Sequence, residues 1–198
     1  MGKELLPPDS DRRPLLHTQH FPQRPPRFGS IVINPQMAFG TGHHATTSLI
    51  LAELLDADLQ GKSLLDMGCG TSVLAILASM RGASPVTAID IDDWCIENSR
   101  TNIALNHLPN PINVLLGDAS LLPGLPEQDI ILANINRNIL LRDMPAYACS
   151  LRPGGELWMS GFYVQDIPVL LEKASQTGLS YVSEREKDNW ACLHLKLN

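Results

Sequence analysis

Short apolar runs alternate with longer amphipathic stretches along this chain from Ile31 to its C-terminus. An apolar run of about four to eight residues between turn residues is typical of a buried strand, and an amphipathic stretch of about ten or more is typical of a helix. Strands that alternate with helices form a parallel sheet with helices on its faces. The predicted strands lie at residues 63–66, 86–90, 112–116, 129–133, 156–160, 179–183 and 191–195.

The predicted helices lie between these strands, at residues 46–55, 73–80, 93–106, 139–151 and 166–177. The last two strands differ, because only a short polar stretch, residues 184–189, separates them. Such a connection is too short for a crossover helix, so these strands are expected to form an antiparallel hairpin at one edge. The sequence therefore predicts an α/β fold with a seven-stranded, mostly parallel, Rossmann-like sheet.

Residues 1–28 do not follow this pattern. They hold six of the 15 prolines, five basic and three acidic residues, and no helix or strand period. Segments of this composition rarely bury enough apolar surface to become ordered. We therefore expect a poorly ordered, proline-rich leader or linker over residues 1–30, and one α/β domain over residues 31–198.

Composition restricts the partners and the compartment. The 198-residue chain has 15 basic and 21 acidic residues and a net charge of -6, the wrong sign for a protein that grips nucleic acid through its whole surface. Its apolar stretches are far shorter than the ~18 residues that span a bilayer. The spacing of the four cysteines fits neither a zinc site nor a disulfide framework. We expect a cytoplasmic protein without a metal, membrane contact or direct nucleic-acid binding.

The strongest local motif joins the first strand of this sheet to the helix after it. Residues 64–72 (LLDMGCGTS) form an apolar strand, an acid and a glycine turn. Glycine at Gly68 and Gly70 lets the backbone turn tightly and lie directly against a ligand. Asp90 ends the next strand, where a carboxylate can accept hydrogen bonds from both hydroxyls of an adenosine ribose. The turn and Asp90 therefore predict an adenosine site at the carboxyl edge of the sheet.

Two features of the turn favour S-adenosylmethionine over a dinucleotide. A dinucleotide site usually carries a third glycine, and Val73 occupies its place. Asp66, two residues before Gly68, would repel a pyrophosphate, whereas it can approach the cationic sulfonium and amino groups of S-adenosylmethionine. The alternative is a plain connection in which Asp66 only caps the turn.

Two polar residues after later strands extend the predicted site. Asp118 is placed to reach the adenine, although an ordinary loop acid is the alternative. Asn134 follows the strand at residues 129–133, and its amide can offer a donor and an acceptor together, although asparagine is also common in turns.

The loop before the first helix, residues 34–47, is dense in glycine, threonine and histidine and is expected to fold over a bound ligand. Its adjacent residues His43 and His44 have no Asp, Glu or Cys at ligand spacing, so a polar loop is favoured over a metal site.

Four segments together resemble the PrmA family, which methylates the eleventh protein of the large ribosomal subunit. They are residues 39–47 (FGTGHHATT), residues 65–70 (LDMGCG), Asp90 and residues 132–135 (LANI). The resemblance covers residues 31–198 and implies a class I methyltransferase that uses S-adenosylmethionine. Carried over position by position, the cofactor contacts of the family fall on Thr47, Gly68, Asp90 and Asn134.

The resemblance implies methyl transfer to lysine side chains and to the N-terminal amine of a ribosomal protein. Asn134 is the expected catalytic residue, because with the backbone carbonyl of Ile135 it would orient an amine toward the methyl group. The chain departs from the family at Ser72, where the turn motif usually ends in glycine, which is tolerable if Ser72 already lies in the helix. It also departs at the N-terminus, because residues 1–30 are too few for the recognition domain of the family.

Other functions stay open. A methylase of an exocyclic base amine uses a similar strand-end asparagine, but one usually followed by prolines and an aromatic residue, where this chain has Ile135 and Asn136. A non-catalytic module that binds S-adenosylmethionine would explain the short N-terminus. An oxidoreductase that uses a dinucleotide is a more distant alternative.

Overall fold

The computed structural model describes residues 15–18, 30–34 and 44–198. Most of the loop expected to fold over the ligand, including His43, lies outside these residues. The first two strands, β1 (Leu15–Thr18) and β2 (Ser30–Ile33), pair in parallel. β1 falls within the predicted leader, and the division of the chain at residue 30 stays a prediction.

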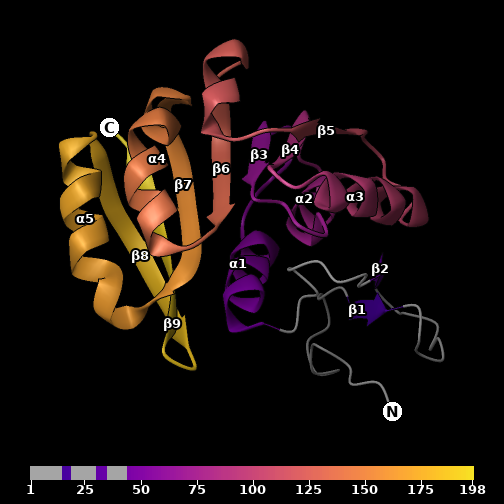
Figure 1. The fold of residues 1–198 in the computed structure, drawn as a ribbon, viewed down its shortest axis with the longest axis horizontal. Coiled ribbons are helices and arrows are strands. Elements are labelled where there is room, and N and C mark those ends of the chain that lie inside the picture. Colours follow the sequence, from indigo (N-terminus) through magenta and orange to yellow (C-terminus); the bar gives the residue numbers. More distant parts are fainter. Residues whose placement is uncertain (1–14, 19–29, 35–43) are drawn as a thin grey trace.

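The predicted seven-stranded sheet is confirmed, with the strand order β5-β4-β3-β6-β7-β9-β8 (Figure 1). Its strands are β3 (Leu64–Met67), β4 (Val86–Asp90), β5 (Ile112–Leu116), β6 (Gln128–Asn134), β7 (Leu151–Tyr163), β8 (Leu179–Lys187) and β9 (Trp190–Leu197). β3 to β7 are parallel, whereas β9 lies between β7 and β8 and runs antiparallel to both. The expected edge hairpin therefore forms, and β8 rather than the last strand occupies the edge.

The hairpin turn is shorter than the polar connection expected at residues 184–189. β8 continues to Lys187, so only Asp188 and Asn189 form the turn, both with positive φ. Asparagine and aspartate tolerate that conformation, which a tight hairpin turn needs. The charged residues that suggested a loop belong instead to an exposed edge strand, where charge discourages pairing with other chains.

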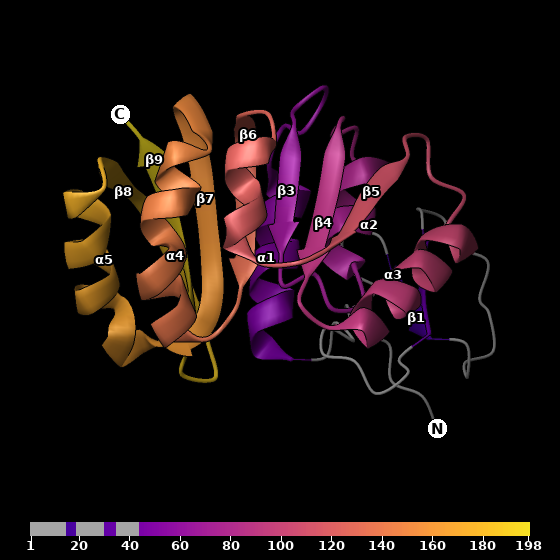
Figure 2. The ribbon, with the colours of Figure 1, turned by 45° about the horizontal axis from the view of Figure 1, so that its top comes forward.

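Helices alternate with most of the strands along the chain and cover the faces of the sheet (Figure 2). They are α1 (Ala45–Asp56), α2 (Val73–Met80), α3 (Asp93–Leu105), α4 (Arg137–Cys149) and α5 (Ile167–Gln176), with short 3-10 helices η1 (Ala119–Gly124) and η2 (Val164–Asp166). α4 starts two residues before its predicted start, because the Asn136 side chain caps it by accepting a hydrogen bond from the Ile139 N–H at 3.2 Å.

Two apolar cores lie on opposite faces of the sheet. α1 and α2 contribute to one core, and α4 and α5 contribute to the other. Along β6, Ile130 and Leu132 belong to the first core, whereas Ile131 and Ala133 belong to the second. Successive side chains of a strand point to opposite faces, so a strand covered on both sides is apolar throughout.

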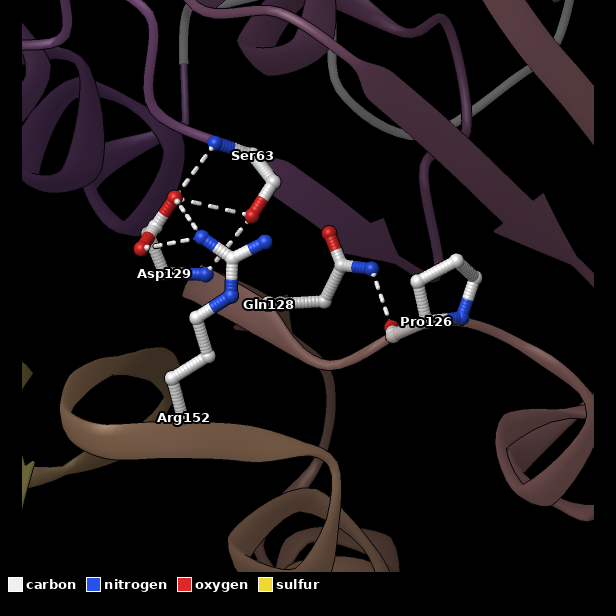
Figure 3. A network of polar contacts seen from close by, with 5 residues as sticks. All are labelled: Ser63, Pro126, Gln128, Asp129 and Arg152. Atoms are coloured by element: carbon white, nitrogen blue, oxygen red, sulfur yellow. Dashed lines mark hydrogen bonds and ion pairs between the residues drawn. The ribbon is translucent and has the colours of Figure 1, made fainter.

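A polar network aligns the amino ends of β3, β6 and β7 (Figure 3). Asp129 at the start of β6 accepts hydrogen bonds from the N–H and the hydroxyl of Ser63, at 2.8 and 2.9 Å. Arg152 of β7 donates to both oxygens of Asp129, at 3.0 and 3.1 Å. Because these contacts fix the strands relative to one another, their opposite, carboxyl ends meet at one edge.

The strand order reverses direction at β3. The chain proceeds from β3 to β4 and β5 on one side, and β6 lies on the other side of β3. In open α/β sheets the crevice at the carboxyl ends of the strands beside such a switch point is the usual ligand site. Among the described residues, no helix is both long and apolar enough to cross a membrane.

Candidate functional site

A cavity of about 590 Å³ opens at the carboxyl edge of the sheet. Its volume falls within the range of roughly 300–1,000 Å³ that small-molecule sites occupy. Five of the predicted site residues line it: Thr47, Gly68, Asp90, Asp118 and Asn134. The other two, Asp66 and Gly70, are buried and do not line it. The topology thus brings together residues that lie far apart in the sequence.

The glycine turn presents bare backbone to the cavity at Gly68. Gly68 and Gly70 have φ of 68° and 52°, in the left-handed region that favours glycine. The N–H groups of Gly68 and Cys69 both donate to the Ile89 carbonyl, at 2.8 and 3.0 Å, which ties the turn to β4. A Cβ at Gly68 would lie 2.8 Å from Cγ1 of Ile135, so a side chain would displace the next wall of the cavity.

Asp90 ends β4 beside the turn, and two backbone amides orient its carboxylate. The Gly70 N–H donates to Oδ2 at 2.9 Å, and the Asp92 N–H donates to Oδ1 at 3.1 Å. A carboxylate oxygen has two lone pairs, so both oxygens keep capacity for a further donor. The carboxylate is therefore held in place and can still accept hydrogen bonds from two hydroxyls.

Asp66 lies beneath the turn, fully buried. Its Oδ2 accepts a hydrogen bond from the Ala75 N–H at 3.2 Å, whereas its Oδ1 has no hydrogen-bond partner among the described residues. Burial raises the pKa of Asp66 from 3.8 to about 7, a rise that the bond from Ala75 reduces and the nearby charge of Asp90 increases. Near neutral pH this carboxyl is therefore partly protonated and carries less negative charge than the sequence suggests.

Asp118 follows β5 at the outer wall of the cavity and is exposed. It caps η1 through Oδ1, which accepts a hydrogen bond from the Ser120 N–H at 2.9 Å. Hydrogen bonds from the hydroxyl and the N–H of Ser120 lower the pKa of Asp118, so the group is ionised at neutral pH.

Asn134 and Thr47 meet at the end of β6, on the other side of β3 from Asp90 at the end of β4. The Asn134 amide donates from Nδ2 to Oγ1 of Thr47 at 3.1 Å, across 87 positions of the sequence. Among the described residues the Asn134 side chain makes no other hydrogen bond. Its Oδ1 and its second amide hydrogen are therefore available to a ligand.

Ile135, the residue after Asn134, packs against a glycine that the sequence analysis did not single out. Gly161 has φ of 98° and lies at an irregularity where the pairing register of β7 with β9 shifts. A Cβ there would lie 2.7 Å from the carbonyl carbon of Ile135. Gly161 therefore leaves room for the Ile135 peptide beside Asn134.

An aromatic group lines part of the same cavity and combines His44, which lies in the loop that the sequence analysis singled out, with Trp190 and Tyr163, which it missed. Trp190, the first residue of β9, contacts the His44 ring edge-on with centroids 4.9 Å apart, and its ring centroid lies 4.2 Å from that of Tyr163. His44 and Trp190 line the cavity. No local motif marks Trp190, because only the insertion of β9 beside β7 brings it to this edge.

Ser72 differs from its expected conformation. It precedes helix α2 instead of lying in it and has φ of 60° and ψ of 22°, a left-handed conformation that explains why glycine is usual here. The reason is that the turn needs a third left-handed residue after Gly68 and Gly70. The Ser72 hydroxyl is buried and donates to Oγ of Ser99 at 2.7 Å, which offsets part of the strain.

The family model described as ribosomal protein L11 methyltransferase (PrmA) matches residues 18–198. The chain belongs to this family. The resemblance noted from the sequence is therefore confirmed, and the match includes every residue that lines the cavity.

Curated relatives carry the same description. A ribosomal protein L11 methyltransferase of Phocaeicola vulgatus is 64% identical over 178 residues, which are 90% of this chain and 63% of the relative. One from Bacteroides thetaiotaomicron is 58% identical over 183 residues, 92% of this chain and 65% of the relative. The chain thus spans less than two thirds of the length of these PrmA relatives.

A solved structure confirms the class I methyltransferase fold. The crystal structure of a ribosomal protein L11 methylase from Lactobacillus delbrueckii subsp. bulgaricus has a TM-score of 0.83 at 24% identity. The match covers 93% of this chain and 95% of that one. Within the described residues, no group of three or more His, Cys, Asp and Glu side chains could hold a metal ion.

Proposed function

We propose that this PrmA-family chain is an S-adenosylmethionine-dependent N-methyltransferase that acts on amino groups of a ribosomal protein in the cytoplasm. The observation that carries the proposal is the pairing of two walls in one cavity. Asp90 and the Gly68 backbone form one wall, and Asn134, held by Thr47, forms the other. The first suits a nucleoside and the second suits an amine.

The residues present fit S-adenosylmethionine. The carboxylate of Asp90 has free lone pairs for the ribose hydroxyls, and Gly68 offers backbone without a Cβ. Asp118 lines the same cavity and would contact the adenine. Gly70 and Asp66 would act from beneath, Gly70 through its bond to Asp90 and Asp66 through its bond to the start of α2. When bound, this cofactor supplies an electrophilic methyl group on a sulfonium.

The acceptor side would orient a neutral amine. Oδ1 of Asn134 and the carbonyl of Ile135 are the two acceptors that would hold the N–H groups and direct the nitrogen lone pair. The rings of His44, Trp190 and Tyr163 provide an apolar boundary beside them. Because only a neutral amine has a free lone pair for attack, its proton would pass to water before transfer.

The substrate is proposed from the relatives, which are named ribosomal protein L11 methyltransferases. Their names indicate protein L11 as the substrate, and we propose lysine side chains and the N-terminal amine as the acceptors, as the family resemblance implies. We further propose that the catalytic domain is residues 31–198, because the large sheet and both cores lie within them.

The acceptor is tested with radiolabelled S-adenosylmethionine and two pools from the same cells, ribosomal protein and ribosomal RNA. We expect label in a protein of the mass of L11, with intact-mass increments of one or more methyl groups. Label in RNA would favour the base methylase. Binding of S-adenosylhomocysteine without product from any ribosomal fraction would favour a non-catalytic module.

The role of Asn134 is tested by Asn134→Ala. We expect the methyl-transfer rate to fall by about 100-fold or more, because the amine loses an orienting acceptor, while the melting temperature stays nearly unchanged. Asn138→Ala is the control, since Asn138 is exposed on α4 and, within the part of the chain that the structure describes, its side chain accepts only from Arg137. Equal losses of stability and turnover in Asn134→Ala would remove Asn134 from the catalytic role.

A further inference from the structure

A chain of hydrogen bonds connects helix α3 to the carboxylate of Asp90. The Ser72 hydroxyl donates to Oγ of Ser99 at 2.7 Å, and the Ser99 hydroxyl donates to the Gly70 carbonyl at 2.8 Å. The Gly70 N–H then donates to Oδ2 of Asp90 at 2.9 Å. We call these four residues, Ser72, Ser99, Gly70 and Asp90, the serine relay.

The relay is shielded from solvent at its serine end. Ser72 and Ser99 are both 0% exposed, so water does not compete for their hydroxyls. Each serine has one hydroxyl proton, and both protons are directed toward the next acceptor of the relay. Hydrogen bonds in such a chain strengthen one another in a low-dielectric interior.

The hydrogen bond from Ser99 restricts the backbone rotation of Gly70, which has no side chain to restrict it. Glycine rotates more freely about its backbone dihedrals than any other residue. Because Ser99 holds the carbonyl of Gly70, it limits the rotation of that residue and with it the direction of the Gly70 N–H. That N–H donates directly to Asp90, so Gly70 links a hydroxyl on α3 to a carboxylate at the cavity.

Ser72 supports the same conclusion independently. A residue with a Cβ is strained in the left-handed conformation, and such strain persists where the surroundings compensate for it. At Ser72, with φ of 60°, the compensation is the bond to Ser99. A glycine at this position would relieve the strain but would remove the donor to Ser99.

We propose that Ser99, supported by Ser72, is a positioning residue that directs the Gly70 N–H at Asp90 and so sets the affinity of the site for the two ribose hydroxyls of a nucleoside. The proposal rests on the proposed function, because it assigns Asp90 to the ribose. It extends the site from the residues that line the cavity to a helix that does not line it.

Ser99→Ala tests the proposal, with calorimetric binding of two ligands as the readout. The ligands are S-adenosylhomocysteine and its analogue that lacks both ribose hydroxyls. We expect Ser99→Ala to weaken the binding of S-adenosylhomocysteine by about tenfold, because the hydrogen bonds from the ribose hydroxyls to Asp90 are misdirected but not lost. The analogue should bind the parent chain more weakly than S-adenosylhomocysteine does, and Ser99→Ala should reduce its affinity by less than about twofold.

Ser79→Ala is the matched control. Ser79 is also 0% exposed and donates to a backbone carbonyl, that of Asn110, at 3.0 Å, but it lies near the far end of α2. It should leave the affinity for both ligands unchanged. Ser72→Gly is the second variant, and it should fold because glycine suits the left-handed backbone. It should weaken the binding of S-adenosylhomocysteine by about threefold and leave the binding of the analogue unchanged.

The outcomes separate this proposal from the proposed function. The proposal is wrong if Ser99→Ala weakens the binding of both ligands equally or of neither. It is also wrong if Ser72→Gly leaves the binding of S-adenosylhomocysteine unchanged, because the relay then does not act through the ribose. If the parent chain binds neither ligand, the cofactor assignment fails and the relay proposal fails with it.

Discussion

Helix α5 packs against the sheet through apolar side chains, whereas α3, on the other face, packs largely through amides and hydroxyls. The buried residues of α5 are Ile167, Leu170 and Ala174, at helical spacing. Those of α3 are Asn98, Ser99 and Asn102, with Ile96 as the one apolar member. Apolar contacts hold a helix in place but do not fix the orientation of individual groups, because they are not directional. Hydrogen bonds also fix the orientation of the donor and the acceptor that they join.

The polar face of α3 uses that directionality. Asn106 accepts from the Val32 N–H and donates to the Val32 carbonyl, both at 2.7 Å. One turn earlier, Asn102 accepts from the Asn34 N–H at 2.8 Å and donates to the Thr71 carbonyl at 3.0 Å. α3 thus orients the β2 segment and the glycine turn, whose Gly68 lines the cavity, while α5 packs through apolar side chains.

The buried acids differ in the same way. On the α4 and α5 side, Asp143 and Asp166 form ion pairs with Arg142 and Arg137, at 2.6 and 2.8 Å. On the glycine-turn side, Asp66 has an oxygen without a hydrogen-bond partner among the described residues, and the buried Tyr147 hydroxyl on α4 is likewise without one. The two faces of the sheet therefore differ in how their buried acids are paired, which suggests three ways to test the comparison.

The largest effect is expected from the pH dependence of Asp66. Burial raises its pKa in the folded state from 3.8 to about 7, so the folded state holds this proton more tightly than the unfolded state. The contribution of Asp66 to the free energy of unfolding is therefore fully present below about pH 4 and is lost as the pH rises to about 7. The loss is at most about 4 kcal/mol. Denaturant unfolding across this range measures it.

Asp66→Asn is the control for that measurement. The asparagine oxygen can still accept from the Ala75 N–H, which bonds Asp66 at 3.2 Å, but it does not ionise. The variant should lose the component of the pH dependence described for Asp66. An unchanged slope would show that other groups cause the dependence.

Leu170→Ala should lower the free energy of unfolding by about 3 kcal/mol, because it leaves a cavity in the core beneath α5. Binding of S-adenosylhomocysteine should stay within about twofold, since α5 orients nothing at the site. Val169→Ala, at an exposed neighbour on the same helix, should change neither quantity. A marked loss of ligand affinity in Leu170→Ala would break the distinction between the two helices.

Asn102→Ala should have a smaller effect on stability, about 2 kcal/mol, because buried partners lose their hydrogen bonds. It should also weaken the binding of S-adenosylhomocysteine by about threefold, because the Thr71 carbonyl of the turn loses a hydrogen-bond donor. Thr101→Ala on the exposed side of α3 is the control. A loss of stability with unchanged affinity would reduce α3 to a structural support like α5.

Local patterns predicted the strands and helices well where the periodicity was apolar. They predicted α2 and β4 with the observed boundaries, because each is nearly fully apolar and bounded by turn residues. They predicted α3 from its length and spacing but did not reveal which polar side chains face inward, since asparagine and serine are ordinary surface residues. They also placed a loop at residues 184–189, where pairing with β9 extends β8 to Lys187.

The sequence by itself determined the α/β fold, the glycine turn and the acid that follows the next strand, because these depend on local periodicity and on residues that only certain backbone conformations accept. The tertiary structure alone decided that Asn134 bonds to Thr47, that Trp190 reaches the cavity, and that Ser99 holds the turn. Each of these contacts joins residues distant in the sequence. Only the order of strands in the sheet, set by burial on both of its faces, brings them together.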